Sequence, residues 1–208
     1  MNNFLQQGLT KYLETTELSK IKNTKILIAG AGGVGSNAAM LLVRCGFEKI
    51  TIIDYDELEP SNLNRQFFFN EQVGTLKVYG LKENLLKINH QATITIIKER
   101  LTVDNVNNLI KNQDIILEAF DDIIAKKIIV EACHLLAKHI IAVSGIAGIG
   151  NSDKIVIRKI NNRFYMVGDF ESDINLALPP LAPKVMIAAA KQVDIVLELV
   201  IGNKEIAT

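Results

Sequence analysis

Three glycines with the spacing G-x-G-x-x-G, namely Gly30, Gly32 and Gly35, directly follow an apolar segment of the chain. In this pattern the first glycine permits a tight turn, the second leaves room for a phosphate against the backbone, and the third allows close packing of the next helix. That helix would present unpaired N–H groups and the positive end of its dipole to the phosphate. Asp54 ends the next apolar segment, where an acidic residue is expected to bind a ribose hydroxyl. The chain is therefore predicted to bind a nucleotide.

A polar loop, DYDELEPSNLNRQ, spans residues 54–66 and supplies groups suited to a triphosphate. Arg65 offers a planar fork of donors to phosphate oxygens, and Lys77 follows with a compact ammonium group. The alternative interpretation of each residue singly is that it belongs to a solvated surface loop. The other polar residues of this loop that we assign to the nucleotide site are Asp56, Asn62 and Gln66.

Two adjacent carboxylates, Asp121 and Asp122, follow the apolar segment 114–118 and precede a helical pattern. One interpretation is that a carboxylate caps the N-terminus of that helix. The other is that Asp121 binds Mg²⁺ beside the phosphates, because Mg²⁺ prefers one or two carboxylates together with phosphate oxygens. The two roles can be divided between the neighbours, and we keep Asp122 among the nucleotide-binding residues.

Strand and helix patterns alternate from residue 25 to residue 143, which is typical of a Rossmann-like α/β fold with a doubly wound, mostly parallel sheet. Ligands bind such a sheet beyond the carboxyl ends of its strands, where Asp54, Asp121 and Ser144 fall. The expected strands are residues 25–29, 49–53, 93–97, 114–118 and 140–143. The expected helices lie at about 33–45, within 74–89, and at 103–111 and 122–137.

The pattern changes after residue 144, where a glycine-spaced loop leads into two short strand patterns. Residues 154–160 and 163–167 predict a β-hairpin that turns at Asn161 and Asn162. An antiparallel β extension is therefore expected to follow the parallel part of the sheet.

Both ends of the chain carry helical patterns. Residues 1–24 are expected to form a helical lead-in that lies against the domain or against a second subunit. An irregular connection over 169–183 precedes a long amphipathic C-terminal helix over 184–201. We treat residues 25–208 as a single domain.

The composition argues against several classes of function. Lysine plus arginine equals aspartate plus glutamate, at 23 each among 208 residues, so no bulk charge attracts nucleic acid or a membrane surface. We find no apolar segment typical of a membrane span or a signal peptide. The two cysteines, Cys45 and Cys133, fall on apolar helical faces outside any C-x-x-C pair, so they are expected to pack, and neither disulfides nor zinc are expected. A reduced, cytoplasmic setting fits this composition.

The sequence is similar to the ThiF/MoeB/HesA group of the ubiquitin-activating superfamily. The likeness covers nearly the whole chain from residue 25 to residue 201, and its SNLNRQ block is far more specific than the glycines. Within the group, the chain most resembles the short ThiF proteins, which adenylylate the sulfur carrier ThiS. The matching motifs are the glycine turn GAGGVGS, the block DYDELEPSNLNRQ, Lys77, the segment EAFDD and the late LAPKV helix.

The resemblance implies that the C-terminal Gly-Gly carboxylate of a small ubiquitin-like carrier, as in thiamine biosynthesis, attacks the α-phosphate of Mg-ATP. The products would be an acyl-adenylate and pyrophosphate, and the enzyme would work as a homodimer. By motif position, the resemblance assigns Asp54 to the ribose, Arg65 and Lys77 to the phosphates, and Asp121 to Mg²⁺. It assigns the ATP-binding turn to Gly30, Gly32, Gly33 and Gly35.

The chain departs from the family pattern in three respects. Longer relatives carry two C-x-x-C pairs for zinc, and some carry a cysteine used in sulfur transfer; this sequence has neither, so the reaction is expected to stop at the adenylate. Asp122 and Lys126 stand where the family often has asparagine and arginine. Many members receive an arginine from the partner's N-terminal helix, whereas the first arginine here is Arg44, which leaves Lys11 or Lys20 as substitutes.

Three other functions stay open at this point. The same chemistry can serve a molybdopterin-pathway or cysteine-pathway carrier, or a tRNA-linked carboxylate as in related dehydratases, although the neutral charge weighs against tRNA. An NAD-dependent oxidoreductase would need a proton donor near the turn, and no histidine ends a predicted strand. A nucleotide-binding scaffold for a carrier protein is disfavoured because Arg65, Lys77 and Asp121 all occur in one chain.

Overall fold

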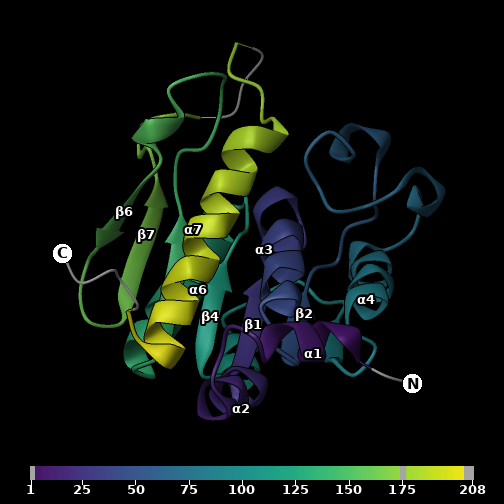
Figure 1. Ribbon diagram of the computed structural model, residues 1–208. Coiled ribbons are helices and arrows are strands. Elements are labelled where there is room, and N and C mark those ends of the chain that lie inside the picture. Colours follow the sequence, from purple (N-terminus) through teal and green to yellow (C-terminus); the bar gives the residue numbers. More distant parts are fainter. Residues whose placement is uncertain (1–2, 174–176, 204–208) are drawn as a thin grey trace.

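The protein is built around a seven-stranded sheet with helices on both faces (Figure 1). A computed structural model describes residues 3–173 and 177–203, so residues 174–176 of the expected irregular connection lie outside the described residues. The strands are β1 (Lys25–Ala29), β2 (Lys49–Ile53), β3 (Thr93–Ile97), β4 (Ile115–Glu118), β5 (His139–Val143), β6 (Val156–Lys159) and β7 (Phe164–Gly168). The α-helices are α1 (Phe4–Leu9), α2 (Thr15–Asn23), α3 (Gly33–Arg44), α4 (Lys77–Ile88), α5 (Val106–Ile110), α6 (Ile123–Leu135) and α7 (Ala182–Ile201). The short 3₁₀-helices are η1 (Pro60–Asn62), η2 (Asn70–Gln72) and η3 (Ser152–Lys154).

The sheet has the strand order β3-β2-β1-β4-β5-β7-β6. All neighbouring strands are parallel except β6 and β7, which form the antiparallel hairpin at one edge. Because β7 runs parallel to β5, the hairpin continues the sheet rather than forming a separate unit. The predicted Rossmann-like α/β fold with an antiparallel extension is confirmed.

Strand β1 shows why a continuous apolar run predicts a strand that is buried on both faces. Ile26 and Ile28 belong to the hydrophobic core formed with α3, α4 and α7. Leu27 and Ala29, which point to the other face, belong to the core formed with α5 and α6. One strand therefore contributes to both cores, which is typical of a parallel sheet covered by helices.

Helix α7 packs along α3 on one face of the sheet, as Figure 1 shows. Pro183 lies in its first turn, where the missing N–H leaves no hydrogen bond unmade. The helix ends at Gly202, whose φ angle of 84° a residue with a Cβ rarely adopts. The expected C-terminal helix is confirmed, and it begins two residues earlier than predicted, at Ala182.

The N-terminal lead-in contains α1 and α2, and α2 packs against α7. Ile21 of α2 is completely buried, so the lead-in contributes to the core. The division of the chain at residue 25 into a lead-in and one domain stays a prediction. Within residues 3–173 and 177–203, no helix has both the length and the apolar character needed to cross a membrane.

The core under α3 can be tested by truncating one leucine. Leu42 is completely buried, so Leu42→Ala should lower the free energy of unfolding by about 2–5 kcal/mol through lost apolar contacts and a cavity. Leu135 is 79% exposed, so Leu135→Ala should change the free energy of unfolding by less than about 0.5 kcal/mol. Urea unfolding followed by circular dichroism measures both, and equal effects would contradict the described packing.

Candidate active site

The predicted site lies where the strand order reverses, at the carboxyl ends of β1 and β4. Gly30, directly after β1, has a φ angle of +105°, which residues with a Cβ rarely adopt. A Cβ there would also lie 2.8 Å from the carbonyl oxygen of Ala119, which follows β4. The two loops therefore meet backbone to backbone at this crossover, and Gly30 provides the tight turn expected of it.

The N-terminus of α3 is open to an anion. Gly32 is its N-cap, and no side chain among the described residues caps this helix, which leaves the N–H groups of its first turn for a ligand. The space beside Gly32 is free, since the nearest described atom to a Cβ there, chain neighbours aside, would be Gln66 Nε2 at 4.0 Å. A Cβ at Gly35, in contrast, would overlap the carbonyl oxygen of Gly30, so this glycine lets the helix lie tightly against the turn. Such a helix end suits a phosphate.

Asp54 holds the glycine turn from the end of β2. Its Oδ2 accepts a hydrogen bond of 2.6 Å from the N–H of Ala31, and its Oδ1 accepts one of 2.8 Å from the N–H of Asp56. Burial raises the pKa of this carboxyl group, and the two N–H groups and the Lys77 ammonium oppose the rise. Each oxygen keeps a further lone pair for a ligand hydroxyl. The ribose role of Asp54 stays a prediction.

Arg65 lies beside the open helix end. A Cβ at Gly33 would lie 3.5 Å from Arg65 Cγ, and Arg65 Nη1 donates to the Ser61 carbonyl oxygen at 2.9 Å and to Asn64 Oδ1 at 2.7 Å. Partial burial lowers the pKa of the guanidinium, whereas the negative charge of Asp121 acts in the opposite direction. The fold thus brings within electrostatic reach a cation and an anion that lie far apart in the sequence.

Asn37 is a site residue that the sequence analysis missed. It is buried on α3, and its Nδ2 donates to the carbonyl oxygen of Gly33 at 2.7 Å and to that of Arg65 at 2.8 Å. It therefore fixes the Arg65 loop to the first turn of the helix. The available signal was a lone asparagine inside an apolar helical pattern.

Lys77 and Asp56 form a salt bridge with an Nζ to Oδ2 distance of 2.8 Å. The lysine side chain is 9% exposed and the aspartate side chain is 48% exposed, so the ammonium is the more buried partner. The backbone N–H of Lys77 also donates to the Asp56 carbonyl oxygen at 2.9 Å. Asp56 therefore orients this cation near Asp54, and the contacts of both residues with a nucleotide stay a prediction.

The two aspartates after β4 have different environments. Asp122 is the N-cap of α6: its Oδ1 accepts from the N–H of Ile124 at 2.8 Å, and its Oδ2 accepts from Arg100 at 3.1 Å. The hydrogen bonds from Ile124 and then Arg100 lower the pKa of this carboxyl group. Asp121 is exposed, and within residues 3–173 and 177–203 no hydrogen bond or ion pair engages its carboxylate. The capping interpretation thus applies to Asp122.

An exposed aspartate near Arg65 suits a Mg²⁺ ion that arrives with a nucleotide. Mg²⁺ commonly takes one or two protein carboxylates and completes its shell with phosphate oxygens and water. The described residues contain no group of three or more side chains that could hold a metal ion by themselves. A single exposed carboxylate fits a metal that is shared with phosphates, and the role of Asp121 as its protein ligand stays a prediction.

Asn62 and Gln66 are the last two predicted residues of the polar loop. Asn62 Oδ1 accepts from the N–H of Glu59 at 3.1 Å and so closes η1. Gln66 is buried, and its Oε1 has no hydrogen-bond partner among the described residues. A buried acceptor without a partner, close to Gly32, suits a donor group on a bound ligand.

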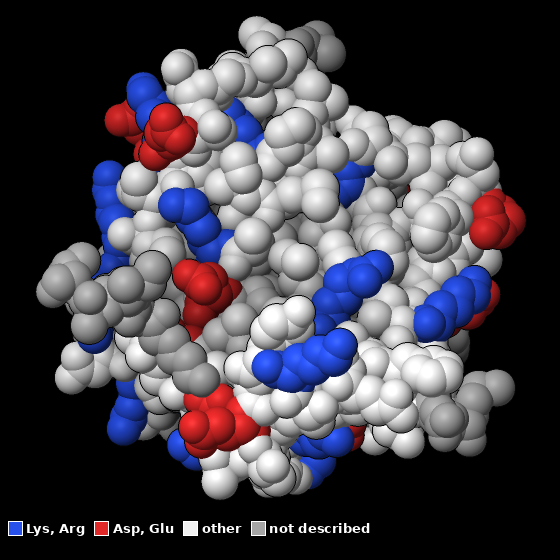
Figure 2. All heavy atoms as spheres, viewed as in Figure 1, with Lys and Arg blue, Asp and Glu red and all other residues white. Residues whose placement is uncertain are grey.

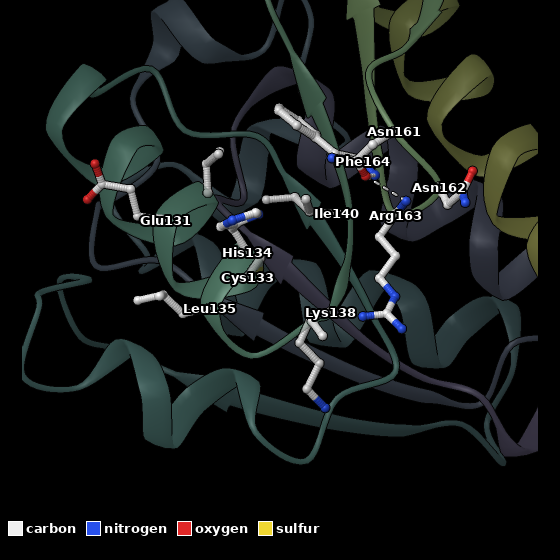
Figure 3. Close-up of a pocket in the computed structure, with 12 residues that line it drawn as sticks. Glu131, Cys133, His134, Leu135, Lys138, Ile140, Asn161, Asn162, Arg163 and Phe164 are labelled. Carbon is white, nitrogen blue, oxygen red and sulfur yellow. Dashed lines mark hydrogen bonds between the residues drawn. The ribbon is translucent and has the colours of Figure 1, made fainter.

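A separate groove of about 910 Å³ lies at the opposite end of the strands (Figure 3). It is lined by the C-terminal half of α6, the start of β5 and the turn between β6 and β7. Figure 3 shows Lys138 and Arg163 on one side of it, away from Glu131. Its lining contains no residue that the sequence analysis assigned to the site. The candidate active site is therefore the crossover of β1 and β4, and not this groove.

Comparison with known proteins assigns the chain to a family. The sequence model of the ThiF family matches residues 6–206 of the chain. The chain belongs to the ThiF family. It is 35% identical over 128 residues to the adenylyltransferase and sulfurtransferase MOCS3 of Aedes aegypti, and 36% identical over 132 residues to the adenylyltransferase and sulfurtransferase UBA4 of Candida albicans. These matches cover 61% and 63% of the chain but only 29% and 30% of the relatives, so the chain spans less than a third of their length.

Solved structures share the fold of this ThiF-family chain. Escherichia coli TcdA, a tRNA N6-threonylcarbamoyladenosine dehydratase in complex with ATP, has a TM-score of 0.84 at 22% identity, covering 93% of the chain and 92% of TcdA. Escherichia coli MccB with ATP has a TM-score of 0.71 at 22% identity, covering 96% of the chain and 64% of MccB. At these identities the likeness concerns the fold.

Neither cysteine of this ThiF-family chain lies in the environment of a reactive thiol. Cys133, on α6, is completely buried, and burial raises its pKa to about 12. Cys45, at the end of α3, is half-buried, and burial followed by the charge of Asp194 raises its pKa. Both environments agree with the packing role expected from the sequence.

Alkylation can test this assignment. Raising the pKa of Cys133 from 9.0 to about 12 lowers its thiolate fraction at pH 8 by about a thousandfold, and burial slows its reaction further. Native protein treated with iodoacetamide should therefore stay unlabelled at Cys133, and protein in urea should be labelled, as read by mass spectrometry. Equal labelling rates in the two states would show that the thiol is accessible.

Proposed function

We propose that this protein transfers AMP from ATP to the C-terminal carboxylate of a small ubiquitin-like carrier protein, producing an acyl-adenylate and pyrophosphate. One observation carries the proposal: the open N-terminus of α3, the Arg65 guanidinium and the Asp121 carboxylate lie together at the β1–β4 crossover. Nucleotidyl transfer needs these parts, namely oriented N–H groups, a cation and a metal-binding carboxylate. Membership of the ThiF family and the adenylyltransferase names of MOCS3 and UBA4 support it.

The reaction needs positioned charge and no protein nucleophile. An oxygen of the ionised acceptor carboxylate attacks the α-phosphorus of ATP and forms a new P–O bond. The bond between the α-phosphorus and the oxygen that bridges to the β-phosphate breaks, and its electron pair leaves with pyrophosphate. No proton has to move, so the residues act by binding phosphates and by neutralising charge on the leaving group.

Each polar group has a task in this scheme. The first N–H groups of α3 and the guanidinium of Arg65 bind phosphate oxygens. Lys77, oriented by Asp56, adds a second cation, and Asp54 braces the turn and binds the ribose. Asp121 holds Mg²⁺, which supplies Lewis-acid neutralisation of the phosphates when bound.

We propose a ThiS-like sulfur carrier as the acceptor, because the chain most resembles the short ThiF proteins. Another protein would then deliver the sulfur, since both Cys45 and Cys133 have raised pKa values. A tRNA-linked carboxylate is the alternative acceptor, because the structural neighbour TcdA is a tRNA N6-threonylcarbamoyladenosine dehydratase. Cationic and anionic residues balance at 23 each, and on the face shown in Figure 2 the described side chains of both signs are interspersed without a continuous basic surface. This balance favours a protein acceptor.

We also propose a homodimer in a reducing, cytoplasmic setting. Lys11 and Lys20 of the lead-in are exposed, so either can reach toward the site of a second subunit. Sedimentation velocity measures the oligomeric state, and a sharp loss of activity in Lys11→Ala or Lys20→Ala would identify the contributing lysine. A monomer with full activity would remove this part of the proposal.

The decisive experiment is ATP–pyrophosphate exchange with Mg-ATP and three acceptors: a ThiS-like carrier with its Gly-Gly tail, the same carrier without the tail, and a tRNA that bears a carboxylate. Exchange only with the intact tail would support the proposed acceptor. Exchange only with tRNA would favour the alternative. ATP binding without exchange would point to a nucleotide-binding scaffold, and tight NAD binding without ATP binding would overturn the assignment.

The role of Asp121 predicts a specific loss. Asp121→Asn should fold normally yet slow pyrophosphate exchange by about a hundredfold to a thousandfold, because a preorganised electrostatic group is worth about 2–4 kcal/mol in the transition state. Arg65→Ala should produce a loss of similar size for the same reason. Asp104→Asn, which changes an exposed aspartate outside the site, is the control. Normal exchange in Asp121→Asn would contradict the magnesium assignment.

A further inference from the structure

An ion pair between a buried carboxylate and a partly exposed ammonium, with side chains 1% and 29% exposed, lies next to the crossover. Glu118, the last residue of β4, is 1% exposed, and Lys126 of α6 donates to its Oε1 at 3.1 Å and to its Oε2 at 3.0 Å. The same ammonium donates to the carbonyl oxygen of Val143, at the end of β5, at 2.9 Å. The pair therefore joins β4, β5 and α6 next to the candidate active site.

The Glu118 carboxylate also fixes the loop that follows β4. Its Oε1 accepts a hydrogen bond of 2.8 Å from the N–H of Phe120, the residue before Asp121. The preceding N–H, of Ala119, donates to the carbonyl oxygen of Ala29 at 2.9 Å. A Cβ at Gly30 would lie 3.2 Å from the Phe120 nitrogen, so this peptide is held between Glu118 and the nucleotide turn.

The other face of the sheet holds the same strand end. Gln192 of α7 is completely buried, and its Nε2 donates to the backbone carbonyl oxygen of Glu118 at 3.1 Å and to that of Ile141 at 2.8 Å. Side chains from α6 and α7 therefore restrain Glu118 from opposite faces. The end of β4 has little freedom to move, and neither has the loop anchored to it.

We propose that Glu118 and Lys126 are positioning residues, which place the Asp121 carboxylate for the metal–nucleotide complex by anchoring the Phe120 peptide. The inference rests on the proposed function. Stability alone does not account for the pair, because apolar residues of similar volume often replace a buried ion pair at no loss of stability. Partners that orient a metal-binding carboxylate typically change metal affinity or activity by about 10–100-fold when removed.

The double variant Glu118→Met/Lys126→Met separates positioning from stability. It leaves no unpaired buried charge, so it should fold, but it removes the acceptor for the Phe120 N–H. The matched control is Lys127→Met/Glu131→Met, an exposed pair on the same helix with an N–O distance of 3.8 Å. The conservative variant Glu118→Gln keeps an acceptor oxygen for the Phe120 N–H, so it should retain most of the wild-type behaviour that the double methionine variant loses.

The main readout is ATP affinity by calorimetry, measured once with Mg²⁺ and once with EDTA. In the double methionine variant, the gain in affinity that Mg²⁺ provides should fall about tenfold or more, and the affinity in EDTA should stay within about twofold of wild type. In pyrophosphate exchange, the KM for ATP should rise with the weaker binding of Mg-ATP, and kcat should fall. The control pair should match the wild type in every measurement.

Hydrogen exchange at the Phe120 amide provides a readout that does not depend on activity. In the wild type this amide should exchange as slowly as that of Ala119, and in the double methionine variant it should exchange faster while the core amides stay protected. Fast exchange at Phe120 in the wild type would overturn the inference even if the variants did not fold.

The outcomes separate the inference from the proposed function. A folded double methionine variant with the wild-type gain from Mg²⁺ and wild-type exchange at Phe120 would show that the pair is only structural, and the proposed function would stand. A wild-type protein that binds no ATP would overturn both. The positioning role would be supported if the gain in ATP affinity from Mg²⁺ falls in the double methionine variant and stays near the wild-type value in Glu118→Gln.

Discussion

The backbone contact between the turn after β1 and the loop after β4 is the constraint on which the rest of the structure depends. Gly30 adopts a positive φ angle and lies against the carbonyl group of Ala119, so a side chain at this position would separate the two loops. The strands β1 and β4 are neighbours in the sheet, yet β2 and β3 lie between them in the sequence. The contact therefore forms only when both halves of the sheet have assembled. It places the glycine turn and the loop that carries Asp121 at one point.

Two buried carboxylates, those of Asp54 and Glu118, stabilise the contact between these two loops. Asp54, after β2, accepts from the N–H of Ala31, and Glu118, at the end of β4, accepts from the N–H of Phe120. Each acidic group thus binds the backbone of one of the two loops. Burial of such charges is unfavourable without partners, and here backbone N–H groups and nearby lysines supply them. The polar interior of the site orders its loops before any ligand arrives.

The arrangement suits chemistry that depends on preorganised charge. An open helix N-terminus, the guanidinium of Arg65 and the carboxylate of Asp121 lie at one edge of the sheet, where the proposed reaction would use them to bind a metal-bound triphosphate. The two cysteines are packed among apolar side chains, which fits a reaction that ends at an adenylate and leaves sulfur chemistry to another protein. Membership of the ThiF family agrees with this division, while the acceptor is the part that fold similarity leaves open, since one fold serves several acceptors.

The sequence by itself determined the fold class, the order of the strands and helices up to small shifts at their ends, and the position of the glycine turn. Hydrophobic periodicity, glycine spacing and apolar runs are local properties of the sequence, and they suffice to predict these features. Motifs such as SNLNRQ also pointed to the family that the comparisons confirm. The boundaries that shifted lie at the ends of elements, which periodicity does not locate; α7 begins at Ala182, so that Pro183 falls in its first turn.

Only the tertiary structure decided how the site is held together. Asn37 falls within the apolar helical pattern at about 33–45, and only the structure shows that its amide fixes the loop of Arg65. The residues alone left open which of Asp121 and Asp122 caps the following helix, and the structure shows that Asp122 caps α6 and pairs with Arg100. The role of Glu118 was likewise invisible, because it depends on partners from other elements. Hydrogen bonds and charge pairs between distant segments follow from packing in three dimensions, and no local pattern along the chain encodes them.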